Sequence, residues 1–146
     1  MIQLNLSVWQ LIEDIQAASF TLASVEKLLG QSLIEQTQQS TVSFQFFAGQ
    51  QLALAGNVNV VDIDLRLPRS TTSNLGMLAL HLGGECITLQ QVRQQFSELD
   101  ITDIPRDGSP EEATTFTATT TWGGVSFGFQ EKKPDCVGYL VFNPGQ

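Results

Sequence analysis

The segment "CITLQQVRQQFS" at residues 86–97 decides how the chain is organised, because its pattern occurs twice. It reads as a strand end, a helix N-cap and a short amphipathic helix. Residues 20–31, "FTLASVEKLLGQ", likewise carry an apolar residue, then Thr-Leu, two variable residues and Val. This recurrence predicts two copies of a small α+β unit.

Three helices are expected around these motifs, over residues 7–17, 21–30 and 88–97. Thr21 is the expected N-cap of the second helix, and Gly30 should end it. Thr88 and Gln91 have the spacing of a capping box at the start of the third helix.

Elsewhere the apolar residues recur with a period of two, which is typical of antiparallel strands with one wet face. In "VVDIDLRLP" (60–68), this alternation predicts Val61 and Ile63 inward and Asp62 and Asp64 outward. The expected strands are residues 40–49, 51–56, 60–68, 77–83, 114–124, 124–129 and 136–144.

The phenylalanines of the first strand are expected in the core. Val42, Phe44 and Phe46 share the predicted inward face, and Phe47 points to the other face. Residues 68–76 between two later strands are expected to form a loop.

The two halves agree in the order and type of their elements. The helix caps Thr21 and Thr88 lie 67 positions apart (88 − 21), and Pro68 and Pro144 lie 76 apart (144 − 68). The sequence therefore predicts an α+β fold of two tandem helix-plus-antiparallel-meander units, with the helices on one face of the sheet or sheets. These units, 7–84 and 85–146, would share a single domain, 1–146; chance similarity of two small α+β units remains the alternative.

The repeat motifs "TLASVEKLLG", "TLQQVRQQFS", "TWGGVSFGF" and "CVGYLVF" resemble the repeat of the β-lactamase-inhibitor-protein family. They are also similar to the small accessory lipoprotein of the outer-membrane barrel-assembly machine. The resemblance covers residues 20–145 and implies a protein-binding scaffold. The chain departs from the pattern at Phe20 and Ile87, where a glycine usually precedes the helix threonine, and it has no lipobox cysteine.

Composition and charge restrict the function classes. The 146 residues are 42% hydrophobic and 15% charged, with a net charge of −8. Nucleic acid is not expected as a partner because phosphate contacts need a basic patch, whereas a basic protein suits an acidic surface. No apolar run has the length of a membrane span. The N-terminal stretch has no basic leader and contains Glu13 and Asp14, which predicts a cytoplasmic protein; a removed leader remains the alternative.

No catalytic motif is recognisable, so the chain is not expected to be an enzyme or to bind a cofactor or metal. The one histidine, His81, and the two cysteines, Cys86 and Cys136, are too few for a structural zinc site. In a cytosolic protein the two cysteines are expected as buried thiols, with a disulfide as the less favoured alternative.

The candidate partner-binding residues lie in an acidic segment and on two strands. Residues 98–112, "ELDITDIPRDGSPEE", are expected to form a long irregular loop, which is a common place for function. The candidates are Asp100, Asp103, Asp107, Glu111, Glu112, Trp122, Asp62 and Asp64. The alternatives are a solvated linker for the acidic segment, a cover of the core edge for Trp122, and a merely wet sheet face for the Asp62–Asp64 pair.

These features together predict a non-enzymatic bacterial inhibitor or immunity protein that neutralises a toxin or enzyme by docking on it. The alternatives are an assembly subunit of a secretion or phage-type complex and a small-ligand-binding module. A homodimer also remains open.

Overall fold

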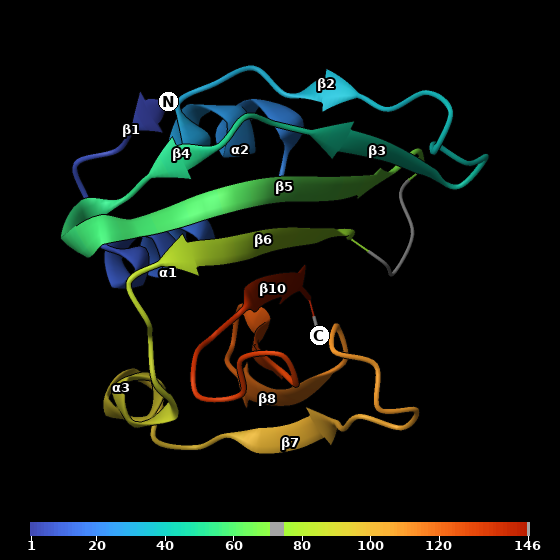
Figure 1. Cartoon of the computed structure of the whole chain (residues 1–146). Coiled ribbons are helices and arrows are strands. Elements are labelled where there is room, and N and C mark those ends of the chain that lie inside the picture. The colour runs from blue at the N-terminus through green and yellow to red at the C-terminus, as the bar shows by residue number, and fades with distance from the viewer. Residues whose placement is uncertain (71–74, 146) are drawn as a thin grey trace.

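The computed structural model describes residues 1–70 and 75–145 and has an α+β fold, as expected (Figure 1). Three α-helices accompany one ten-stranded sheet in this part of the chain. The helices are α1 (Val8–Ala17), α2 (Leu22–Leu29) and α3 (Leu89–Gln95). The strands of the first half are β1 (Ile2–Gln3), β2 (Ile34–Glu35), β3 (Phe44–Ala48), β4 (Leu52–Ala53), β5 (Val58–Pro68) and β6 (Met77–Gly84). Those of the second half are β7 (Asp100–Asp103), β8 (Ala113–Thr119), β9 (Gly123–Gln130) and β10 (Tyr139–Pro144).

The sheet joins the two halves of the chain through their last strands. Its order is β1-β4-β5-β6-β10-β9-β8-β7, and β3, with β2 beside it, also pairs with β5. β6 and β10 run antiparallel, with Leu80 opposite Leu140 and Leu78 opposite Phe142. The last strand of the chain therefore lies inside the sheet, and β7 forms one edge.

Helix capping follows the sequence predictions. The Thr21 hydroxyl accepts a hydrogen bond from the Ser24 amide, and Gly30 ends α2 in the left-handed region with φ 66°. Thr88 and Gln91 form the predicted capping box of α3. Such caps satisfy amide groups that a helix leaves unpaired at its first turn.

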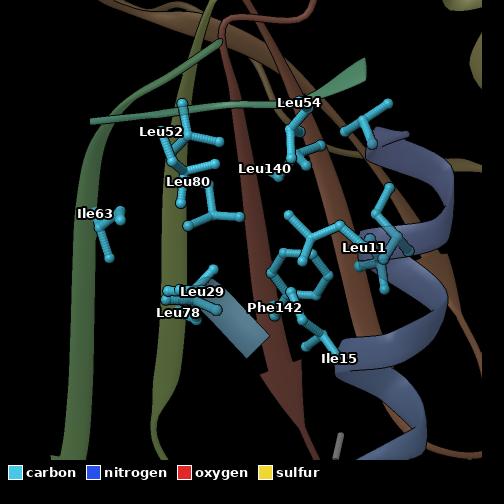
Figure 2. Packing of buried hydrophobic residues seen from close by; sticks show 14 of the residues in the cluster. Leu11, Ile15, Leu29, Leu52, Leu54, Ile63, Leu78, Leu80, Leu140 and Phe142 are labelled. Atoms are coloured by element: carbon cyan, nitrogen blue, oxygen red, sulfur yellow. The ribbon is translucent and has the colours of Figure 1, made fainter. Parts of the chain in front are cut away.

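One hydrophobic core lies between the helices and one face of the sheet. Leu11 and Ile15 of α1 point toward Leu140 and Phe142 of β10 (Figure 2). Buried residues of both halves belong to the same cluster. Each fully buried aliphatic or aromatic side chain contributes about 1.5–3 kcal/mol of hydrophobic stabilisation.

The predicted orientation of the phenylalanines in β3 is wrong. Phe47 is buried and pairs with Leu65, while Phe46 pairs with Arg66 on the opposite face. Val42, predicted inward, precedes the strand and is 95% exposed. The core thus takes one phenylalanine of this run, and Phe44 and Phe46 are half-buried on the other side.

A β-bulge overturns the predicted orientation of Val61. The register of β5 against β6 shifts between Val60 and Asp62. Because a bulge inserts one extra residue, Val60 and Ile63 both reach the core, and Val61 is 42% exposed. Strict alternation cannot predict this break.

Two further segments differ from the predicted loops and strands. The acidic segment begins with the edge strand β7 rather than with irregular structure. The predicted strand 51–56 is reduced to β4 and a 3-10 turn over Ala55–Asn57. Of the predicted loop 68–76, residues 71–74 lie outside the described residues.

The cysteines form a disulfide, contrary to the expectation of buried thiols. The Cα atoms of Cys86 and Cys136 are 5.1 Å apart, and 50 positions separate them along the chain. The bond connects the segment before α3 to the segment between β9 and β10. Sequence spacing could not decide this pairing, because it depends on bringing the two segments together.

Candidate functional site

The face of the sheet opposite the helices is the candidate site, and we call it the open face. In Figure 1, α1 is seen behind β5 and β6, and α2 behind β4. Residues of the open face follow from the strand registers, because side chains alternate along each strand. In the middle of the sheet they are Phe44, Phe46, Asp62, Asp64, Arg66, Met77, His81, Tyr139, Val141 and Asn143.

The open face carries an unexpected group of aromatic and apolar side chains. Phe44 and Phe46 of β3, Met77 of β6, and Tyr139 and Val141 of β10 are each half-buried there. A solvated face of an antiparallel sheet is normally polar. Aromatic residues, methionine and arginine are the residue types enriched at protein interfaces. We call these five residues, together with Arg66, the open-face patch.

Arg66 is held over this patch by two neighbours. Its guanidinium carbon lies 4.5 Å from the centre of the Phe46 ring, and its Nη2 is 2.9 Å from Asp64 Oδ2. Next to this group is a hollow of about 290 Å³, lined by Phe44, Phe46, Arg66, Gly76, Met77 and Asn143. Because Arg66 is already held in place, binding a partner here costs less side-chain entropy than it would with a freely moving arginine.

Tyr139 lies across the sheet rather than out of it. Its ring covers Gly128, where an added Cβ atom would overlap the tyrosine ring. The Tyr139 hydroxyl is 2.9 Å from Thr115 Oγ1, two strands away. The ring centre is 5.9 Å from that of His81. Gly128 below the ring and Thr115 at the hydroxyl therefore hold Tyr139 in place. The ring face that points away from Gly128 contributes to the open-face patch.

Beyond Tyr139 the open face becomes small and polar. Thr117 Oγ1 is 2.7 Å from Ser126 Oγ and 2.8 Å from Thr102 Oγ1, which forms a row of hydroxyls across β9, β8 and β7. Ser126 and Thr115 are buried. The aromatic and apolar residues of the open-face patch thus lie on β3, β6 and β10, with Arg66 of β5 beside them.

Most candidate carboxylates of the acidic segment have partners within the chain. Glu112 accepts hydrogen bonds from the backbone amides of Arg106, Asp107 and Ser109, at 2.8 to 3.4 Å. Those from Arg106 and Ser109 are the main causes that lower the pKa of Glu112. Glu112 therefore organises the loop on which it lies.

Two other carboxylates form ion pairs. Glu111 lies 2.8 Å from Lys132, and Asp103 lies 3.4 Å from Arg106. Asp100 and Asp107 are exposed. The acidic segment therefore presents fewer unpaired charges than its sequence suggests.

The structure does not bring all predicted site residues together. Asp62 and Asp64 are on β5, whereas Asp100 and Asp103 are on β7, at the far edge of the second half. Trp122 packs edge-on against Phe20 and Phe142, with ring centres 6.2 and 6.4 Å apart. These contacts favour the interpretation that Trp122 covers the core edge.

Sequence reasoning missed the open-face patch itself. The signal was present in "FQFFA" (44–48), because adjacent phenylalanines in a strand must face opposite sides. Tyr139, Val141 and Met77 carried no such signal, since each follows a normal alternating pattern.

The described residues show no group of three His, Cys, Asp or Glu side chains placed to hold a metal ion. A smaller hollow, of about 180 Å³, lies between His81, Gln130, Lys133 and the disulfide. Within the same part of the chain, no helix is both long and apolar enough to cross a bilayer.

Comparison with known proteins does not assign a function to this chain. No family model, no curated protein and no solved structure matches the chain.

Proposed function

We propose that this chain is a non-enzymatic inhibitor or immunity protein that binds its target protein with the open face of the sheet. The open-face patch carries this proposal. Its aromatic, methionine and arginine side chains are half-exposed and lie on paired strands, and Phe44, Phe46, Arg66 and Met77 line a hollow. Rigid aromatic and arginine anchors provide most of the binding energy in many protein interfaces.

The proposed partner is basic near the docking site. Asp62 is exposed and Asp64 is partly exposed beside the patch, and the net charge of the chain is −8. Opposite charges speed the encounter of two proteins and fix their relative orientation. Inhibition by docking requires complementarity and slow dissociation, and no chemistry.

We also propose that the scaffold consists of two tandem units. The pairing β2-β3-β5-β6 in the first half has the same order as β7-β8-β9-β10 in the second. In the last hairpin of each unit, buried residues correspond at one offset of 62 (140 − 78). The pairs are Ile63 and Val125, Leu65 and Phe127, Leu78 and Leu140, and Leu80 and Phe142.

This offset supports a different alignment of the strands from the one that the prolines suggest. It matches β6 with β10 and β5 with β9, and not the segment around Pro68 with that around Pro144. The connections 69–76 and 131–138 then have equal length. Like the inhibitor-protein repeat that the motifs resemble, such a unit offers a broad sheet face for binding.

For the location we propose an oxidising compartment in place of the cytoplasm that the sequence suggests. Disulfides persist mainly outside the reducing cytosol, and Cys86 and Cys136 are bonded. Intact mass after alkylation of freshly lysed cells, with and without reductant, tests this. Two alkylated thiols without reductant would contradict the proposed location.

The test of function is capture of the partner by matched variants. Met77→Glu/Val141→Glu places two charges in the patch, whereas Ile34→Glu changes an exposed residue on β2 and serves as the control. We expect the wild-type protein and the control to recover one basic protein near one-to-one, released by high salt, and the patch variant to lose it. Equal recovery by the patch variant would rule out the open face. Recovery of a multi-subunit complex would favour an assembly subunit instead.

A further inference from the structure

The outer edge of β7 is a second feature with the properties of a binding site. β7 pairs with β8 on one side, and no other strand of the described residues pairs with its outer edge. All four residues, Asp100–Asp103, are exposed. An exposed edge presents unpaired backbone N–H and C=O groups, to which another extended chain can add.

The helix side of this edge is apolar. Ile101 pairs with Phe116 of β8 and is 59% exposed. Phe116 borders a groove of about 540 Å³ between α3 and β8, and its ring contacts Phe129 edge-on. The groove is lined further by Thr88, Leu89, Gln90, Thr114, Pro134 and Asp135. An apolar side chain on an added strand would cover Ile101 and border this groove.

The other side of the edge is acidic. Asp100 and Asp103 pair with Thr117 and Thr115, whose side chains lie on the open face, so their carboxylates point to that side. The Asp103 side chain is 58% exposed, and its only charged contact among the described residues is Arg106, at 3.4 Å. Exposed pairs of this kind contribute little, so a partner's cation can replace Arg106.

We propose that β7 binds an extended segment of a partner protein by strand addition, and that this segment alternates basic and apolar residues. Its basic side chains meet Asp100 and Asp103, and its apolar side chain lies next to Ile101. A second copy of this chain is disfavoured at this edge, because pairing β7 with β7 would bring like charges together. The inference does not depend on the open-face patch, which lies on other strands.

The test uses a peptide of alternating arginine and valine and measures its affinity for the full-length protein. The control peptide has the same side chains but carries N-methyl groups on all its backbone amides, so that neither edge can donate hydrogen bonds to β7. We expect the N-methylated peptide to bind about tenfold more weakly or worse, because several backbone hydrogen bonds are lost. NMR shifts of amides 100–104 should locate the bound peptide.

Matched protein variants make the result decisive. Ile101→Lys and Asp100→Asn/Asp103→Asn should each weaken binding, and Arg106→Ser should strengthen it by releasing Asp103. Ile34→Lys, at an exposed position on β2, should leave the affinity unchanged. The proposal is overturned if the peptide does not bind, if N-methylation has no effect, or if sedimentation shows a dimer that Ile101→Lys dissociates.

Discussion

At the scale of single residues, Glu112 shows how a charged side chain can organise the loop on which it lies. Its side chain is half-buried, and its carboxylate accepts hydrogen bonds from three backbone amides of the segment 106–109. These hydrogen bonds lower the pKa of Glu112, with that from Arg106 as the largest cause. The ionised form is therefore favoured by the folded loop.

The first prediction is that this loop loosens in acid. A carboxyl group whose pKa is lowered on folding stabilises the structure above its unfolded pKa, and this stabilisation is lost as the pH falls through the folded pKa. NMR titration should show the amides of residues 106, 107 and 109 shifting together below the usual range of a glutamate. In Glu112→Gln, the same amides should be less protected from exchange at neutral pH. Unchanged protection in this variant would contradict the assigned role.

Gly128 gives the second prediction at this scale. An added methyl group would overlap the Tyr139 ring, so Gly128→Ala must displace that ring from the sheet. We expect a loss of about 1–3 kcal/mol in unfolding free energy, as for other overpacked sites. Tyr139→Phe is the control, because it removes only the hydroxyl bond to Thr115 and should cost about 1 kcal/mol. Urea denaturation measures both unfolding free energies. If Gly128→Ala costs no more than Tyr139→Phe, the Tyr139 ring does not depend on the missing side chain at position 128.

At the scale of elements, two adjacent residues of β3 have different expected roles: Phe47 in stability and Phe46 in binding. Phe47 is buried against Leu65, whereas Phe46 lies under Arg66 on the open face. Phe47→Ala should lower the unfolding free energy by about 3–5 kcal/mol. Phe46→Ala should cost only about 1 kcal/mol, mainly the cation–π contact, and should weaken binding of the captured partner. A larger stability loss for Phe46→Ala than for Phe47→Ala would reverse the assignment of faces.

The disulfide gives a prediction for the elements that it connects. It closes a segment with a sequence separation of 50, for which loop-closure entropy predicts about 4 kcal/mol of stabilisation. The variant Cys86→Ser/Cys136→Ser should lose stability of that order in thermal or urea unfolding. Adding reductant to the wild type should have the same effect and should leave the variant unchanged. If reductant does not destabilise the wild type, the bond contributes nothing in solution.

These elements also show what could be predicted from the sequence. Helices were predictable because their caps are local: Thr21, Gly30 and the Thr88–Gln91 box act within a few residues. Faces of strands were predictable only where alternation is unbroken, as at Asp62 and Ile63, which are exposed and buried as expected.

The errors have non-local causes. The bulge after Val60 depends on pairing with β6, and the face chosen by Phe47 depends on its pairing with Leu65. The edge strand β7 forms only because β8 is available beside it. The open-face patch combines strands that are distant in sequence, and a single sequence does not encode that proximity in any local pattern.

At the scale of the whole molecule, the two halves share one hydrophobic core. Trp9 of α1 contacts Phe127 of β9, with ring centres 6.5 Å apart, and Phe20 contacts Trp122. The Gln16 side chain also donates a hydrogen bond to Thr120. The first half therefore covers the second half as well as its own strands.

The last prediction follows from this shared core: a fragment of residues 85–146 should not fold alone. Without the first half it loses β6 as the neighbour of β10, and Phe127 and Phe142 lose the cover of α1. Circular dichroism and proton–nitrogen correlation spectra should show an unfolded fragment, whereas the full chain should unfold in one transition. Mixing fragments 1–84 and 85–146 should restore the native spectrum, because the β6–β10 ladder and the core can form between them. A fragment 85–146 that folds cooperatively by itself would mean that the two units are separate domains, and that the open face is divided between them.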